Sequence, residues 1–181
     1  MSRRIPRSSI KPLAIFITAA VFLCCLDVPA LHAERWGTTD APVIRIIIEK
    51  SKRTMTLLWQ DRQVKIYRIA LGRDPVGPKV MEGDNKTPEG LYFVDEKIID
   101  SVYHRALHLT YPSLADVEKA KSLGVEPGGG IEIHGMRDAQ MWMGDLQYLF
   151  DWTYGCIALT NSEIEEVWDL VALWTPVEIR P

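Results

Sequence analysis

The sequence predicts a mainly β fold with two or three peripheral helices. Short apolar, β-branched runs follow one another closely, as at residues 43–49 and 54–59, and tight turns separate them. This spacing favours antiparallel strands over alternating βαβ units. A chain of 181 residues with 47% hydrophobic and 25% charged residues is long enough for one domain with a substantial core.

In chain order, strands are expected at 43–49, 54–59 and 64–71. A long loop at 73–86 then closes on a β-turn at 87–90, where proline is second and glycine fourth. The second half of the chain alternates strands with short helices. Strands are expected at 91–99, 102–111, 131–134, 156–159 and 177–179, and helices at 113–124, 138–150 and from 161 to the residues before Pro176.

The first 33 residues have the layout of a secretory signal peptide. They combine a basic start, an apolar run at 13–26 and small residues suited to cleavage. The apolar run is shorter than the roughly 20 residues that a membrane span needs. We therefore expect residues 1–33 to be a signal peptide, 34–42 a linker and 43–181 the domain, in a protein exported to the periplasm or cell envelope without a permanent membrane span.

The charge and the cysteine content of the chain limit the classes of function that it can have. Without residues 1–33 the chain has 17 basic and 23 acidic residues and no basic patch, which argues against nucleic acid as a partner. Cys24 and Cys25 fall within the predicted signal peptide, so Cys156 is the sole cysteine of the predicted mature protein. Exported proteins use cysteine chiefly in disulfide pairs. An unpaired one indicates a reactive thiol or an intermolecular bridge, with a small buried hydrophobe as the alternative.

Cys156 has a candidate chemical partner 22 residues upstream, where His134 ends an apolar run. A free thiol has a pKa of about 8.5 and is mostly protonated near neutral pH. An imidazole that the fold brings beside it can accept that proton. Together the two side chains form a minimal pair for acyl transfer.

Three sequence blocks, in this order, resemble the L,D-transpeptidase catalytic domain (the YkuD family). The resemblance covers residues 43–181 and implies a β-sandwich-like fold of mixed short strands, with no cofactor. It also implies a cysteine enzyme that acts on peptidoglycan stem peptides and passes the acyl group to a stem amine, a lipoprotein lysine or water. The blocks are Thr87-Pro88-Glu89-Gly90-Leu91-Tyr92, Ile131-Glu132-Ile133-His134-Gly135 and Gly155-Cys156-Ile157.

The resemblance assigns roles by position. Cys156 is the expected nucleophile, His134 the general base, and the backbone carbonyl of Gly135 the group that orients the imidazole. The backbone amides of Tyr154, Gly155 and Cys156 are the expected oxyanion hole.

Three further residues are expected to contact substrate, namely His104, Trp152 and Thr153. For Trp152 simple packing is the alternative interpretation. A metal site built from the histidines is not expected, because no carboxylate or cysteine joins them at ligand spacing.

The motif departs from the common pattern Ser-His-Gly-Cys-Ile-Arg at Thr153, Tyr154 and Ala158. These departures leave three functions open. The first is transpeptidation to an amine acceptor. The second is hydrolysis by an L,D-carboxypeptidase or endopeptidase of peptidoglycan or lipoprotein bonds, and the third is an inactive module that binds peptidoglycan.

Overall fold

The structure is a computed structural model that describes residues 45–181. The predicted signal peptide and the linker lie outside the described residues. Eight strands, two α-helices and one 3-10 helix make up the described part. The strands are β1 (Arg45–Glu49), β2 (Thr54–Trp59), β3 (Arg62–Arg68), β4 (Gly90–Ser101), β5 (His104–Leu109), β6 (Glu132–His134), β7 (Ile157–Ala158) and β8 (Pro176–Arg180); the helices are α1 (Leu114–Ser122), η1 (Asp138–Leu149) and α2 (Asn161–Leu170).

The strands form one mixed sheet in the order β3-β2-β1-β8-β4-β5-β6-β7. Sequential neighbours such as β1–β2 and β4–β5 pair antiparallel, as the short turns predict. Two pairs, β1–β8 and β6–β7, are parallel. Parallel pairing needs a long connection, and both pairs join segments far apart in the sequence. The mainly β fold of mixed short strands is confirmed, and the purely antiparallel interpretation is corrected at these two pairs.

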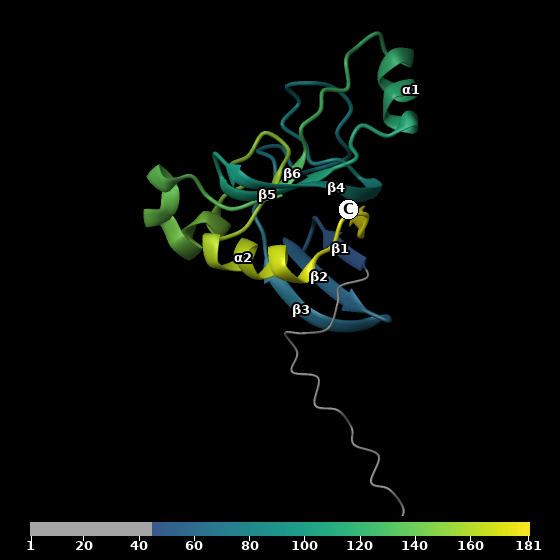
Figure 1. Cartoon of the computed structure of the whole chain (residues 1–181). Coiled ribbons are helices and arrows are strands. Elements are labelled where there is room, and N and C mark those ends of the chain that lie inside the picture. The colour runs from purple at the N-terminus through teal and green to yellow at the C-terminus, as the bar shows by residue number, and fades with distance from the viewer. Residues whose placement is uncertain (1–44) are drawn as a thin grey trace, which may run out of the picture. The chain divides into compact units, whose positions relative to one another are not determined.

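The sheet folds back on itself at β4. Residues 90–93 of this long strand pair with β8, whereas residues 94–101 pair with β5. Figure 1 shows the result, with β1, β2 and β3 on one side of the core and β4, β5 and β6 on the other. An isolated bridge between Ala70 and Ala158 links the segment after β3 to β7, at the opposite end of the strand order. The two ends of the sheet therefore meet beside Cys156.

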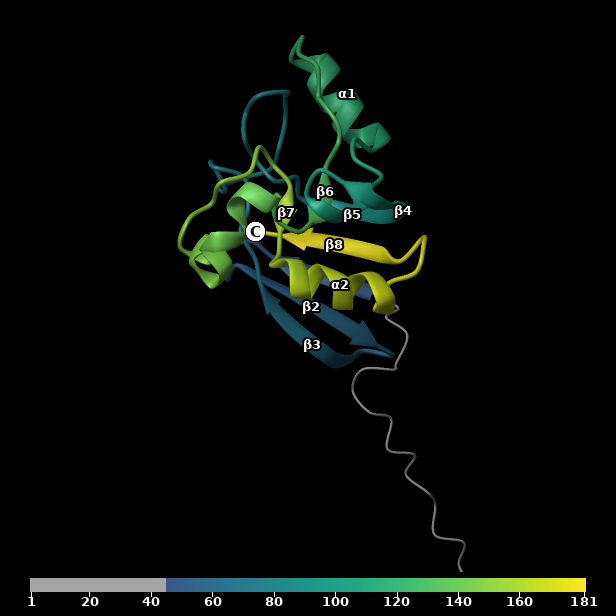
Figure 2. The same ribbon diagram turned by 60° about the vertical axis from the view of Figure 1, so that its left-hand side comes forward.

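Helix α2 lies between the two halves of the sheet (Figure 2). Its first turn is a capping box in which Thr160 and Glu163 satisfy each other's backbone amides. Ile164 and Val167 are fully buried in the core. Charged side chains fix the helix on both sides: Lys65 of β3 pairs with Glu166, and Arg105 of β5 pairs with Glu165 at 3.1 Å.

The segment at 138–150 differs from the predicted amphipathic helix. It is a 3-10 helix interrupted at Gly144, whose φ of 46° and ψ of −128° are not helical. The predicted apolar face is therefore not formed, and of the residues in η1 only Gln147 is buried. The four apolar side chains whose spacing suits one face of a helix are exposed to between 53% and 77%, namely Trp142, Leu146, Leu149 and Phe150.

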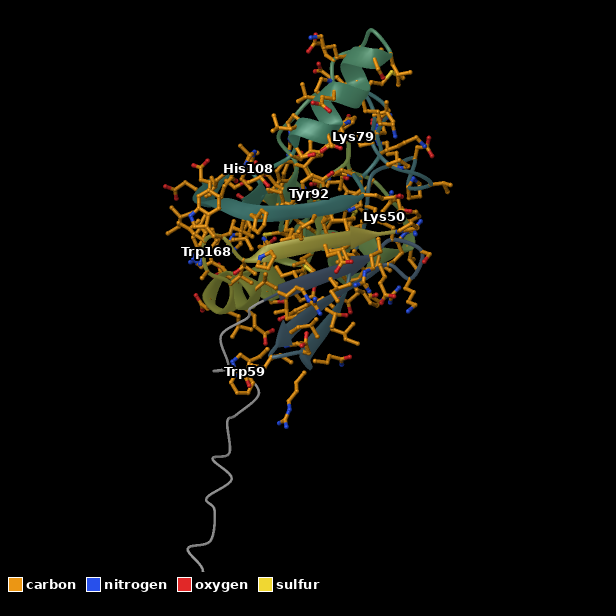
Figure 3. All side chains as sticks on the ribbon, turned by 90° about the vertical axis from the view of Figure 1, so that its right-hand side faces the viewer. Lys50, Trp59, Lys79, Tyr92, His108 and Trp168 are labelled. Carbon is orange, nitrogen blue, oxygen red and sulfur yellow. The ribbon has the colours of Figure 1, made fainter. Side chains whose placement is uncertain are left out.

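The long loop at 73–87 is held by two buried lysines (Figure 3). Lys50 is 2% exposed; its Nζ donates to the Thr87 carbonyl at the end of this loop at 2.9 Å and lies 2.8 Å from Glu89 Oε1 just beyond it. Lys79 is 5% exposed and its Nζ lies 2.8 Å from Asp84 Oδ1. Burying an ammonium group is costly unless it is paired, so these contacts fix the path of the loop. The loop in turn forms one wall beside the cysteine.

Candidate active site

The parallel pairing of β6 with β7 brings the two predicted catalytic side chains to one place. His134 is opposite Ala158 in this pair, and the Leu159 amide donates to the His134 carbonyl at 2.8 Å. Cys156 comes directly before β7. As a result, His134 and Cys156 line the same cavity of about 200 Å³. We call this cavity the histidine-side cavity.

A backbone carbonyl fixes the His134 imidazole. Its Nδ1 lies 2.6 Å from the carbonyl oxygen of Gly135. Because a carbonyl only accepts hydrogen bonds, Nδ1 is the donor, and Nε2 carries the free lone pair. Glycine is required at 135, since a Cβ there would lie 2.6 Å from Asn161 Oδ1 and 2.9 Å from Ile164 Cγ2.

His134 is enclosed by aromatic rings. Its ring stacks on Tyr103 at 4.2 Å between centroids and lies edge-on to Trp152 at 5.9 Å. Burial lowers the pKa of His134 to about 4; the hydrogen bond to Gly135 opposes this shift, and the charge of Arg137 adds to it. The imidazole is therefore neutral near pH 7 and able to accept a proton.

The Cys156 thiol is protonated in the resting site. Burial raises its pKa to about 11, and a hydrogen bond from the Glu132 backbone opposes this shift. Its Sγ lies 3.5 Å from the Gly130 carbonyl oxygen, which accepts from the thiol. With a neutral imidazole and a neutral thiol, proton transfer accompanies attack on the substrate and does not precede it.

Thr153 shapes the turn that presents Cys156. Its Oγ1 donates to the Cys156 carbonyl at 2.7 Å and accepts from the Gly155 amide at 3.1 Å. The second bond engages one of the three amides predicted for the oxyanion hole. Within residues 45–181, the amides of Tyr154 and Cys156 take part in no turn, loop or side-chain hydrogen bond. These two remain the candidates for binding an oxyanion.

Gly155 is needed for the close approach of the long loop. Its φ is 134°, and a Cβ would lie 2.7 Å from the Lys86 carbonyl oxygen. Gly72, on the bridge to Thr153, is equally constrained, with a Cβ position 2.1 Å from the Asn85 carbonyl oxygen. A side chain at either glycine would displace the loop or the turn that carries the thiol.

The structure places the three residues predicted to contact substrate in two different cavities. Trp152 and Thr153 both line the histidine-side cavity. His104 does not: it borders a separate cavity of about 560 Å³, and its Nε2 lies 2.5 Å from Glu165 Oε1. The structure thus places His104 away from Cys156, in an ion-pair cluster with α2.

Four residues of the histidine-side cavity escaped the sequence analysis, namely Arg73, Tyr103, Arg137 and Gln140. Arg137 follows His134 by three residues, and this nearness is the sole sequence signal among the four. Tyr103 and Arg73 reach the cavity through strand pairing and through the bridge at Gly72, which no local pattern encodes.

A second cavity of about 310 Å³ is also lined by Cys156. Cys156 and Tyr154 line both cavities. The second is formed largely by the glycine run at 128–130 together with Lys79 and Glu82. We call it the glycine-side cavity. Cys156 thus lines two separate cavities.

Among residues 45–181, no three His, Cys, Asp or Glu side chains are grouped so as to hold a metal ion. No helix of this same part is both long and apolar enough to cross a bilayer.

Comparison with known proteins identifies the family of this chain. The family model of the L,D-transpeptidase catalytic domain (YkuD) matches residues 44–179. "Putative L,D-transpeptidase YafK" of Escherichia coli (strain K12) is 31% identical over 134 residues, which cover 71% of this chain and 47% of that protein.

Solved structures agree with this match. The helical cell shape determining protein Pgp2 of Campylobacter jejuni is 29% identical with a TM-score of 0.59, over 77% of this chain and 48% of Pgp2. Bd1075 of Bdellovibrio bacteriovorus, at 24% identity, shares the fold with a TM-score of 0.56, over 77% of this chain and 48% of Bd1075. The chain spans about half the length of these relatives. It belongs to the L,D-transpeptidase catalytic domain (YkuD) family, which acts on peptidoglycan.

Proposed function

We propose that this protein is an L,D-transpeptidase that transfers the acyl group of a peptidoglycan stem tetrapeptide to an amine. The observation that carries the proposal is the position of Cys156, which lines a cavity with His134 on one side and the glycine-side cavity on the other. An acyl donor and an amine acceptor each need space next to the same sulfur. The two cavities that Cys156 lines provide it.

The first step forms a thioester. His134 Nε2 takes the thiol proton as Cys156 Sγ attacks the carbonyl carbon of the third stem residue. The amides of Tyr154 and Cys156 stabilise the negative charge on the carbonyl oxygen. The bond to the terminal D-alanine then breaks, and the imidazolium returns its proton to the leaving amine.

The second step regenerates the enzyme. The acceptor amine attacks the thioester carbonyl and gives a proton to the neutral His134. The thiolate leaves, receives that proton and becomes the thiol again. A new amide bond replaces the one that was broken, so no energy source beyond the donor peptide is required.

Hydrolysis is the second candidate function, with water as the acceptor. The position of Ala158 favours hydrolysis. This residue is fully buried and forms the bridge to Ala70, so its methyl group contributes nothing to the cavities. The arginine of the common motif has no counterpart at this position. In this case the enzyme acts as an L,D-carboxypeptidase or endopeptidase on stem peptides or on lipoprotein linkages.

The proposed setting is the periplasm or cell envelope, after export directed by residues 1–33. The proposed partners are peptidoglycan stem peptides as donor and either a second stem or a lipoprotein lysine as acceptor. Remodelling of the wall, or of cell shape, is the corresponding role.

A digest of tetrapeptide muropeptides with the purified protein tests these proposals. Mass spectrometry should detect cross-linked dimers together with free D-alanine. Tripeptide or cleaved monomers without dimers would instead establish the hydrolase. Cys156→Ala should abolish both, and product formation that survives this substitution would overturn the mechanism. Peptide binding without any product from the wild type would identify an inactive binding module.

A further inference from the structure

The histidine-side cavity carries two positive charges and no negative one. Arg73 and Arg137 line it, and none of its other lining residues is acidic. Among the ion pairs of residues 45–181, neither arginine has a carboxylate partner. Arg45, Arg53, Arg105 and Arg180, by contrast, are each paired. Two unneutralised guanidinium groups at one cavity create a local preference for an anion.

Arg73 is held in place by two contacts. Its Nε donates to the Trp152 carbonyl at 3.2 Å, and its Cζ lies 4.5 Å from the centre of the Tyr154 ring. The Arg73 backbone amide also donates to the Thr153 carbonyl at 3.0 Å. These contacts use one face of the guanidinium and its Nε, so both terminal nitrogens stay available to a ligand.

Arg137 is held in the same way against another ring. Its Cζ lies 4.5 Å from the centre of the Tyr103 ring, and its Nη2 donates to the Tyr103 hydroxyl at 2.9 Å. Stacking on an aromatic ring limits the rotamers of a long side chain before any ligand arrives. Each arginine is thus supported by one tyrosine, and each tyrosine itself lines the cavity.

Two residues that line the same cavity each have a buried polar atom without a partner. Trp152 Nε1 is a buried donor and Gln140 Oε1 a buried acceptor, and neither makes a hydrogen bond within the described residues. Buried polar atoms without partners are rare in folded proteins, and they are costly unless a ligand satisfies them. A peptide carbonyl and amide would satisfy these two atoms only after the side chains shift, because neither atom is exposed to the cavity in this structure. The two arginines therefore carry the preference of the cavity for a ligand with a carboxylate.

We propose that Arg73 and Arg137 bind a carboxylate of the acyl donor and so hold its peptide in the histidine-side cavity. The inference rests on the proposed function and adds to it the side chains that select the donor. Guanidinium groups bind carboxylates through paired, charge-assisted hydrogen bonds. A stem tetrapeptide has two suitable groups, the α-carboxylate of its last residue and the free carboxylate of the diamino acid at its third position.

Binding to the full-length Cys156→Ala protein tests the inference without turnover. Titration calorimetry would use three synthetic tetrapeptides: one with both carboxylates free, one with the terminal carboxylate amidated, and one with the diamino-acid carboxylate amidated. Adding Arg73→Ala or Arg137→Ala should raise the Kd of the free peptide about tenfold or more, since a charge-assisted contact is lost. Amidating the recognised carboxylate should weaken binding similarly, and the arginine substitutions should then add little.

Arg62→Ala is the matched control. It removes the same charge from an exposed arginine on β3 that has no ion pair within the described residues, and it should leave the Kd unchanged. Equal Kd values with and without Arg73 and Arg137, or equal losses for free and amidated peptides, would overturn the inference, as would a parent protein that binds no peptide. Failure of the wild type to turn the peptide over would count against the proposed function alone.

Discussion

Tyr103 stacks on the His134 imidazole at 4.2 Å between ring centroids, with 29° between the ring planes. The two residues come from different parts of the sheet, Tyr103 from the turn between β4 and β5 and His134 from the end of β6. Burial is the main cause of the low pKa of His134, and Tyr103 is one of the rings that provide it. Tyr103 is therefore a positioning residue that helps to keep the base neutral.

Removing this ring should raise the pKa of His134. In Tyr103→Ala the imidazole gains access to water, and its pKa moves from about 4 toward the ordinary value of about 6.5. The base is active only when neutral, so the acidic limb of the kcat/KM profile should shift to higher pH. NMR titration of the His134 ring measures the pKa directly. Tyr103→Phe keeps the stacked ring and should titrate like the wild type; an unchanged pKa in Tyr103→Ala would contradict this account.

The resting thiol should behave as a weakly ionised group. Its pKa is raised to about 11, so the rate of alkylation of Cys156 by iodoacetamide should still be rising above pH 9. Peptide mass spectrometry separates Cys156 from the two cysteines of the predicted signal peptide. A preformed thiolate–imidazolium pair would instead give a rate that levels off in the acidic range. Observation of such a plateau would show that proton transfer precedes attack.

Gly135→Ala should be both destabilising and inactivating. The new methyl group would lie 2.6 Å from Asn161 Oδ1, which accepts the Met136 amide at 2.6 Å. Overpacking of this kind typically costs about 1–3 kcal/mol of unfolding free energy. Urea unfolding measures the loss. Gly129→Ala is the control, because its Cβ would have no heavy atom within 4 Å, and comparable losses at both glycines would refute the steric argument.

The features that the sequence predicts well are those encoded by residues close together in the chain. Local alternation identifies the strands, and capping boxes identify α1 and α2. His134 and Cys156 stand out because their neighbouring blocks are distinctive. The failure at 138–150 has a local cause: apolar spacing predicts a helix, but the positive φ of Gly144 interrupts it, and spacing alone carries no information about that angle.

The errors at the site have non-local causes. His104 begins β5 at a φ of 76°, next to a register shift in the β4–β5 pair, and its ring therefore meets Glu165 of α2. Alternation along a strand assumes regular geometry, which this position lacks. Arg73 reaches the cavity through pairing of Gly72 with Thr153, two positions 81 residues apart. Nothing near either position signals that contact.

The hydroxyl of Thr153 should matter for catalysis more than for stability. It holds the Cys156 carbonyl at 2.7 Å and the Gly155 amide at 3.1 Å, and so it sets the direction of the amides proposed to stabilise the oxyanion. Thr153→Val removes both bonds with little change of shape. The expected result is a fall in kcat of about tenfold or more, since misplaced oxyanion donors are costly, with KM changed much less because the cavity wall is retained. Thr153→Ser restores the hydroxyl and should recover most of the activity in the same muropeptide assay. An active Thr153→Val variant together with an inactive Thr153→Ser variant would show that the methyl group, and not the hydrogen bonds, is what the turn requires.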